Sequence, residues 1–170
     1  MVWTLYNKVK VDHIFEQSLQ EKGLTYTRFT TGPSILQNVL WHCIAEGDSV
    51  YYDGLYSLLD SKPVVHISEI PKNYHLLETT VEEDHTLNRL AWFSNDYYGI
   101  MDVGDGIIQV NDLRYGTFKG DGSKPKDYIF SFKIDLDENG KYQMLKTQAG
   151  PPNDRQDDWF QEFWERIKGI

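Results

Sequence analysis

The sequence predicts an α+β fold: a curved, mainly antiparallel sheet of about seven or eight strands with an N-terminal, a middle and a C-terminal helix. Three observations predict it. Apolar residues recur at helical spacing in three segments. Short runs rich in β-branched and aromatic residues fill the rest of the chain. Tight turns of Gly, Asn and Asp join these runs, which is typical of antiparallel pairing.

The helices are expected at residues 2–21, 84–95 and 157–168. In the first, four apolar residues share one face: Val11, Ile14, Phe15 and Leu19. Gly23 follows as a C-cap, and Asp84 precedes the second helix as an N-cap. The third helix is strongly amphipathic. The first helix starts without a capping residue, which suggests that it continues from a preceding segment.

The strands are expected between these helices. Four runs before the second helix read as strands: Thr25–Thr31, Ser34–Ala45, Ser49–Leu59 and Val64–Ile70. Four more follow it: Tyr97–Asp102, Ile107–Leu113, Tyr128–Leu136 and Lys141–Lys146. No repeat, low-complexity tract or linker divides the sequence, so we expect a single soluble domain over residues 1–170.

Composition excludes several function classes. The net charge is −9, and no basic run is present, which argues against nucleic-acid binding and against docking on anionic lipids. No apolar stretch is long enough for a membrane span, and no signal peptide is present. The one cysteine, Cys43, is expected to be a buried apolar residue.

No complete catalytic or metal site is found. The five histidines lack metal-ligand spacing, so no metal ligand is predicted. His42 and Cys43 are adjacent on a predicted strand, so their side chains point to opposite faces and cannot form a dyad. Asp135, Asp137 and Asn139 resemble the start of a calcium loop, but the bidentate position holds Lys146, which favours a hairpin turn.

Three stretches are richer in polar and aromatic residues than a core requires. They supply a candidate binding surface: Trp41, Tyr52, Tyr56, Ser57, Asp60, Trp92, Ser94, Asp112 and Arg114. Asp112 and Arg114 share a strand face, and Arg114 can bind a carboxylate with two hydrogen bonds. That carboxylate belongs either to the protein, as a structural ion pair, or to a ligand.

The same stretches carry a family resemblance over about Lys8 to Gly116. Four motifs occur in order: Gly32-Pro33 with Leu36, Asn38 and Leu40-Trp41; Tyr51-Tyr52-x-Gly54-x-Tyr56-Ser57-Leu58-x-Asp60; Leu90-x-Trp92-Phe93-Ser94; and Asp112-Leu113-Arg114-Tyr115-Gly116. Together they resemble the C-terminal soluble region of the YdjM-type inner-membrane proteins, a bacterial family described as membrane-bound metal-dependent hydrolases.

The resemblance implies that this chain is a fragment whose membrane spans lie N-terminal to it. The metal-binding residues of such proteins belong to that membrane part, so the divalent metal would be held there and no cofactor in this chain. The domain would then be tethered to the inner membrane, on a side that is not specified. Its first partner would be its own transmembrane region.

Three functions stay open at this point. The first is an accessory domain of a membrane-bound hydrolase, which binds a ligand or a partner and is not catalytic alone. The second is a self-contained hydrolase that divides acid and base roles between carboxylates, with Glu46, Asp48, Asp60 and Asp112 as candidates. The third is a protein-interaction module, which an exposed cluster of Trp and Tyr would favour.

Overall fold

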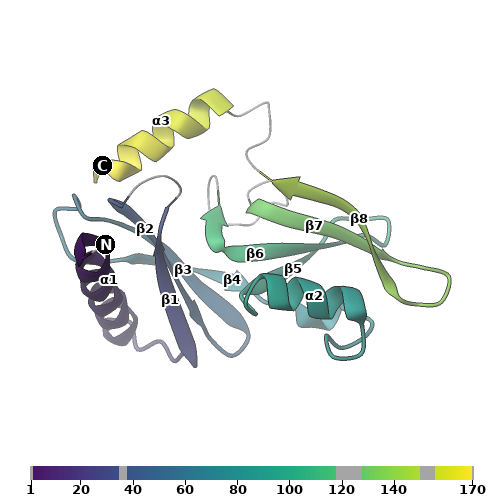
Figure 1. The fold of residues 1–170 in the computed structure, drawn as a ribbon. Helices are drawn as coiled ribbons and strands as arrows, with labels where there is room; N and C mark the ends of the chain where they lie inside the picture. The colour runs from purple at the N-terminus through teal and green to yellow at the C-terminus, as the bar shows by residue number, and fades with distance from the viewer. Residues whose placement is uncertain (1, 35–37, 118–127, 150–155, 170) are drawn as a thin grey trace. The chain divides into compact units, whose positions relative to one another are not determined.

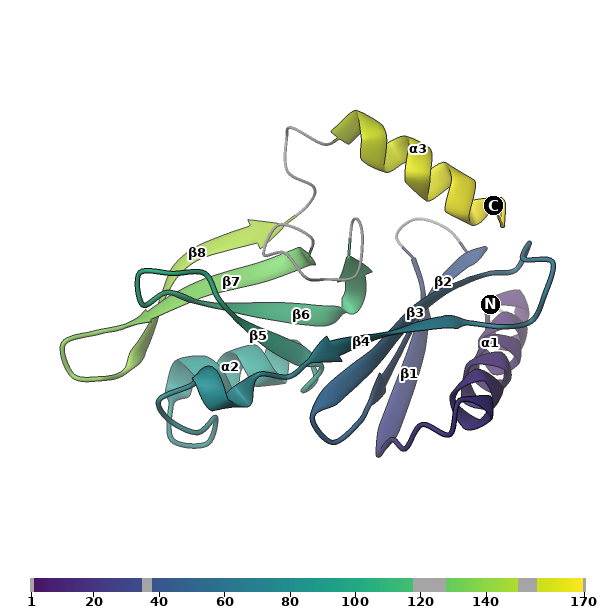
Figure 2. The same ribbon diagram turned by 180° about the vertical axis from the view of Figure 1, so that it is seen from behind.

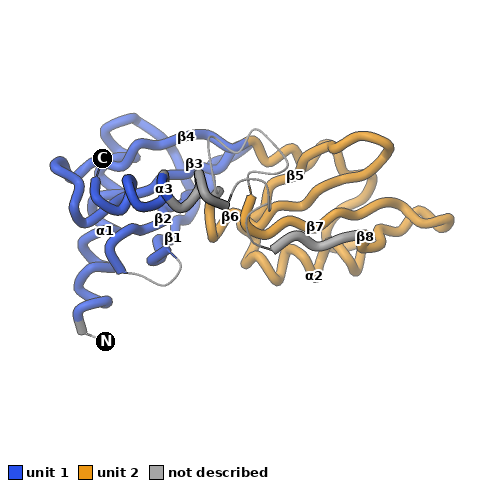
Figure 3. Tube along the Cα trace, turned by 90° about the horizontal axis from the view of Figure 1, so that it is seen from above, with its two compact units in different colours: residues 1–70, 153–170 blue, residues 71–152 orange. Residues whose placement is uncertain are grey.

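The structure is a computed structural model, and it describes residues 2–34, 38–117, 128–149 and 156–169. The chain divides into two compact units: residues 1–70 with 153–170, and residues 71–152 (Figure 3). Both units have the same order of elements, a helix followed by a four-stranded antiparallel meander (Figure 1). The α+β class expected from the sequence is therefore what the structure shows.

Unit 1 consists of α1 (Val2–Glu21), β1 (Arg28–Pro33), β2 (Leu40–Glu46), β3 (Val50–Ser57), β4 (His66–Pro71) and the C-terminal α3 (Gln156–Ile167). Its strands pair in the order β1-β2-β3-β4. The helix α1 packs on the sheet face that carries Trp41, Cys43 and Ala45. The predicted apolar stripe of α1 supplies its side of this core, since all four of its residues are buried.

The predicted end of α1 is confirmed. Gly23 has a φ of 66°, the left-handed conformation that glycine adopts without strain. Its N–H donates to the carbonyl of Gln20, and the N–H of Leu24 donates to the carbonyl of Leu19. These two bonds satisfy carbonyls at the end of the helix.

Gly54 in β3 permits a close approach of the chain. A Cβ atom at this position would lie 2.5 Å from Cγ1 of Val65 and 2.8 Å from the carbonyl oxygen of His66. Any side chain would therefore force the backbone that leads into β4 to move. This contact accounts for the glycine between Tyr52 and Tyr56, whose side chains pack toward α1.

Unit 2 consists of the 3₁₀ turn η1 (Tyr74–Leu76), α2 (His85–Phe93), β5 (Tyr98–Asp102), β6 (Ile108–Thr117), β7 (Tyr128–Leu136) and β8 (Tyr142–Ala149). The strands pair in the order β5-β6-β7-β8. The helix α2 lies on one face of this sheet (Figure 2) and buries Leu87, Leu90 and Ala91 there. Asp84 is its N-cap, as expected: Oδ1 accepts the N–H groups of Thr86 and Leu87.

The eight strands form two sheets, whereas the sequence led us to expect one curved sheet. The reason lies in the connection between β4 and β5. Pro71 ends β4, and residues 72–97 then contain η1 and α2, so no short turn joins these two strands. Turn chemistry predicts hairpins well, but it cannot predict which strands pair across a connection that contains a helix.

Candidate binding surfaces

The nine predicted site residues divide between the units, and the aromatic ones in unit 1 are buried. Trp41, Tyr52 and Tyr56 have exposed fractions of 0%, 8% and 2% and belong to the core beneath α1. Their alternation along β2 and β3 places them on the helix-covered face. They are core residues of unit 1 and line no accessible wall there.

Ser57 and Asp60 attach the C-terminal helix to unit 1. The Ser57 hydroxyl donates to the carbonyl of Ile167 at 2.6 Å. Asp60 accepts two hydrogen bonds from the Arg166 guanidinium at 2.6 and 2.8 Å, and Arg166 also donates to the Leu55 carbonyl at 2.7 Å. Both residues thus have protein partners that explain their polarity.

In unit 2, Asp112 and Arg114 form an ion pair. Nε and Nη2 of Arg114 donate to the two oxygens of Asp112 at 3.0 and 2.6 Å, and Nη2 also donates to the Phe93 carbonyl at 2.6 Å. The Asp112 side chain is fully buried, and the hydrogen bonds to it raise the pKa of Arg114. This is the geometry of the structural ion pair, and it joins β6 to the end of α2.

A bulge and a cap complete this corner of unit 2. The register between β6 and β7 shifts between Asp112 and Thr117, where Gly116 has a φ of 72°. Ser94, another predicted site residue, is buried at the end of α2, and its hydroxyl donates to the carbonyls of Leu90 and Ala91. It therefore closes the helix.

The side chains around Arg114 form an exposed aromatic–arginine surface, made of Trp92, Phe93, Arg114 and Tyr115. The guanidinium carbon of Arg114 lies 5.6 Å from the centroid of the Phe93 ring and 5.4 Å from that of Tyr115, within range of cation–π attraction. Trp92 is 81% exposed. Trp, Tyr and Arg are the residue types that dominate protein-binding surfaces.

The carboxylates proposed for a self-contained hydrolase do not gather within unit 1. Glu46 pairs with Arg28 at one end of β2, while Asp60 binds Arg166 beyond the opposite end of the β2–β3 pair. Asp48 is exposed in the turn between these strands, and Asp112 belongs to unit 2.

Cys43 and His42 point to opposite faces of the unit 1 sheet. Cys43 is in the core beneath α1, whereas Nε2 of His42 lies 2.5 Å from Oδ1 of Asp53 on the other face. This buried His–Asp pair was not anticipated, because its partners are on different strands. Burial, and then the charges of Asp53 and Asp12, raise the pKa of the Cys43 thiol.

We therefore expect Cys43 to be unreactive in the folded chain. Its reaction with a thiol-specific disulfide reagent at pH 8 should be about a hundredfold or more slower than in denaturant, because the thiolate is disfavoured and the sulfur is enclosed. The absorbance of the released thiolate gives both rates. Equal rates would show that Cys43 is accessible.

The suspected calcium loop is the turn between β7 and β8. Oδ1 of Asp137 accepts the N–H groups of Asn139 and Lys141 at 2.8 and 2.9 Å. These two backbone donors lower the pKa of Asp137. The aspartate thus organises the hairpin, as its position before Asn139 and Gly140 predicts.

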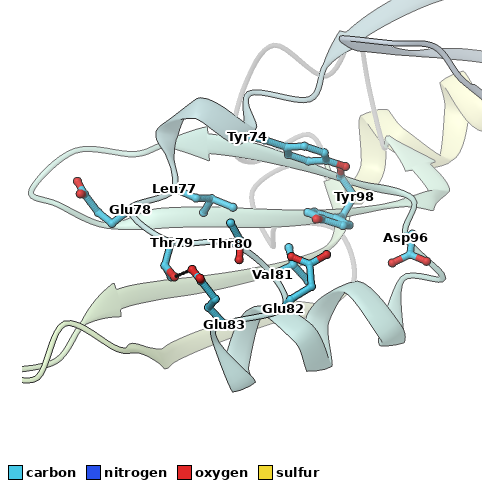
Figure 4. A pocket seen from close by; sticks show the side chains of 10 residues that line it. All are labelled: Tyr74, Leu77, Glu78, Thr79, Thr80, Val81, Glu82, Glu83, Asp96 and Tyr98. Carbon is cyan, nitrogen blue, oxygen red and sulfur yellow. Dashed lines mark hydrogen bonds between the residues drawn. The ribbon is translucent and has the colours of Figure 1, made fainter.

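Two features have no counterpart in the predicted site. The first is a cavity of about 530 Å³ in unit 2, the acidic tyrosine pocket, lined by Tyr74, Leu77, Glu78, Thr79, Thr80, Val81, Glu82, Glu83, Asp96 and Tyr98. Figure 4 shows Glu78 at one end, Asp96 at the other, and the rings of Tyr74 and Tyr98 between them. These rings stack with centroids 5.0 Å apart. Only the acidic run at Glu82-Glu83 hints at this site in the sequence.

The second feature is the first half of α1. From Val11 onward its apolar residues are buried, but Trp3, Leu5, Tyr6 and Val9 are each at least 64% exposed. The rings of Trp3 and Tyr6 stack at a centroid distance of 6.3 Å. These four residues are called the α1 aromatic face below. Helical periodicity continues through both halves, so the sequence alone does not distinguish the covered half from the exposed one.

Within the described residues, no three His, Cys, Asp or Glu side chains come together as metal ligands. Among the helices of the described ranges, none combines the length and the apolar character that crossing a membrane requires. Comparison of the chain with family models, curated proteins and solved structures finds no match.

Proposed function

We propose that this chain is a non-catalytic accessory domain of a membrane-bound hydrolase, held against the membrane by the α1 aromatic face. The four ordered motifs that resemble the YdjM-type proteins support the family, and the exposure of Trp3, Leu5, Tyr6 and Val9 carries the proposal. The hydrolase reaction and its divalent metal would belong to the membrane part of the whole protein.

The chemistry of this face fits the boundary between a bilayer and water. Trp and Tyr prefer this boundary because their rings are apolar while their N–H and O–H groups need polar partners. Lys10 is exposed on the same half of the helix, and its ammonium can reach the headgroups. Lys8 is instead neutralised by Asp12 at 2.6 Å. With a chain charge of −9, attraction should come from the rings and not from anionic lipid.

The aromatic–arginine surface of unit 2 is the part that we assign to binding a partner or ligand. The Asp112–Arg114 pair neutralises the guanidinium and fixes it between two rings. The surface thus offers rigid aromatic area with little side-chain entropy left to lose on binding. The runner-up function, a protein-interaction module without a hydrolase, would use this same surface.

We expect the chain to float with zwitterionic phosphatidylcholine vesicles in a density gradient, and Trp3→Ala/Tyr6→Ala to reduce the bound fraction. Each ring buries about 150–250 Å² when it enters the interface, so losing both should weaken binding about tenfold or more. The matched control is Trp92→Ala/Tyr115→Ala, which removes the same two residue types from the other exposed surface.

Equal loss in both variants, or no flotation of the unmodified chain, would contradict attachment through α1. The non-catalytic half of the proposal is tested separately. The chain, supplied with Zn²⁺ or Mn²⁺, should not hydrolyse nitrophenyl esters or phosphates above the rate of buffer with the same metal. Robust turnover with bound zinc would overturn it.

A further inference from the structure

The acidic tyrosine pocket has the size and rigidity of a small-molecule site. Its volume of about 530 Å³ is within the range of ligand pockets. Its walls are fixed to the sheet at two points. The Asn73 amide donates to the Ile100 carbonyl at 3.0 Å, and the N–H of Glu78 donates to the Tyr142 hydroxyl at 3.0 Å. The pocket is therefore formed before any ligand arrives.

The charged residues that line the pocket are all acidic: Glu78, Glu82, Glu83 and Asp96. Glu83 has a local partner, since the Thr79 hydroxyl donates to it at 3.1 Å, and hydrogen bonds from Thr79 and Thr80 lower its pKa. The others surround a partly enclosed space in which their repulsion is less screened than in bulk water. A cationic ligand would relieve this repulsion.

Tyr98 is the buried polar group of the pocket. It is only 7% exposed, and Figure 4 shows its ring between Tyr74 and Glu82. Burial, followed by Tyr74 and by the carboxylates of Asp96 and Glu82, raises the pKa of Tyr98. Its hydroxyl therefore stays neutral and accepts a hydrogen bond from an ammonium group. Both carboxylates are close enough to act on the same ammonium.

The carboxylates are spread along the pocket, and they do not surround one point (Figure 4). Glu78 lies at one end and Asp96 at the other, while Leu77 and Val81 supply apolar surface between them. This alternation matches a chain of methylene groups with an ammonium near each end. The stacked tyrosines cover each other's inner faces, so no aromatic cage is open for a quaternary ammonium.

We propose that this pocket binds a linear aliphatic polyamine, with one ammonium at Glu78 and another between Glu82, Asp96 and the Tyr98 hydroxyl. The site lies entirely within unit 2 and is independent of the proposed membrane attachment.

The test is calorimetric titration of the whole chain with spermidine at about 150 mM NaCl, where weak surface attraction is screened. We expect saturable binding of one molecule per chain. Glu82→Gln/Asp96→Asn should weaken it about tenfold or more, because two charge-assisted contacts are lost. Asp96 has a φ of 60°, a conformation that asparagine also tolerates, so the backbone should be kept.

The matched control, Asp105→Asn/Glu138→Gln, removes two exposed carboxylates from hairpin turns of unit 2 outside the pocket, one of them also at a positive φ. Thermal melting by circular dichroism checks the folding of each variant, and Glu78→Gln, at an exposed position, serves if the first variant unfolds. No saturable heat, equal weakening in pocket and control variants, or binding of lysine-containing peptides but not spermidine would overturn the proposal.

Discussion

Replacing Trp41 by alanine should lower the free energy of unfolding by about 3–5 kcal/mol, the range for removing a large aromatic side chain from a core. The indole is 0% exposed and packs in the core beneath α1. Its Nε1 lies 3.4 Å from the carbonyl of Asn38, so a weak hydrogen bond is lost as well. Urea unfolding followed by circular dichroism at 222 nm measures the change.

Trp92→Ala is the matched control, since the chemical change is identical but this side chain is 81% exposed. Its effect on the unfolding free energy should stay within about 0.5 kcal/mol. The two tryptophans were assigned to one surface from the sequence, so this pair of variants separates the two environments directly. A loss below about 1 kcal/mol for Trp41→Ala would show that the core placement is incorrect.

The contrast between Trp41 and Trp92 shows what the sequence could predict about the site. A strand with aromatic residues at alternate positions has one packed face, but the sequence does not say whether that face meets a helix or a ligand. In β2 and β3 it meets α1, whose apolar stripe was itself predicted. Trp92 stays exposed because the buried face of the short helix α2 is already supplied by Leu87, Leu90 and Ala91.

Local signals predicted the elements well. The bounds of α1 and β7 agree with those expected, and the other elements differ at their ends. Asp112 and Arg114 were expected to share a face, and they form an ion pair. What the sequence could not supply are partners that only the tertiary fold brings together: Asp53 for His42, Arg166 for Asp60, and Tyr98 for Tyr74.

The repeated arrangement of the two units was also hidden. Each is a helix followed by a four-stranded meander, yet α1 spans 20 residues and α2 only 9. Because the sheets are covered by helices of such different length, the apolar patterns of the two halves do not align. Two sheets with separate cores, with α1 on one and α2 on the other, satisfy the same local patterns that a single curved sheet would.

Asp84→Ala should lower the free energy of unfolding by about 2–4 kcal/mol, because one carboxylate has two structural roles. Oδ1 caps α2, whose loss costs about 1 kcal/mol. Oδ2 accepts the N–H of Tyr142 at 3.0 Å, and leaving this buried donor unpaired costs about 1–3 kcal/mol more. Only the first role could be predicted from the sequence.

Serine at the same position separates these contributions. Asp84→Ser keeps a cap oxygen but does not reach Tyr142, so it should recover about 1 kcal/mol of the loss seen with alanine. Asp84→Asn should stay destabilised, because an amide that caps with its oxygen presents N–H groups to the N–H of Tyr142. Asp102→Ala, which removes an exposed carboxylate that accepts one N–H from Gly104, should cost about 0.5 kcal/mol or less and serves as the control.

The order of these four variants carries the argument. If serine restored full stability, the bond to Tyr142 would contribute nothing, and β8 would be held to α2 by packing and by the Thr86 hydroxyl, which donates to the Tyr142 carbonyl at 2.7 Å. If alanine and serine were equal, the cap would be the idle part. The expected order, with alanine and asparagine lowest and serine between them and the unmodified chain, requires both bonds to stabilise unit 2, and it fixes the wall of the acidic tyrosine pocket through the same strand.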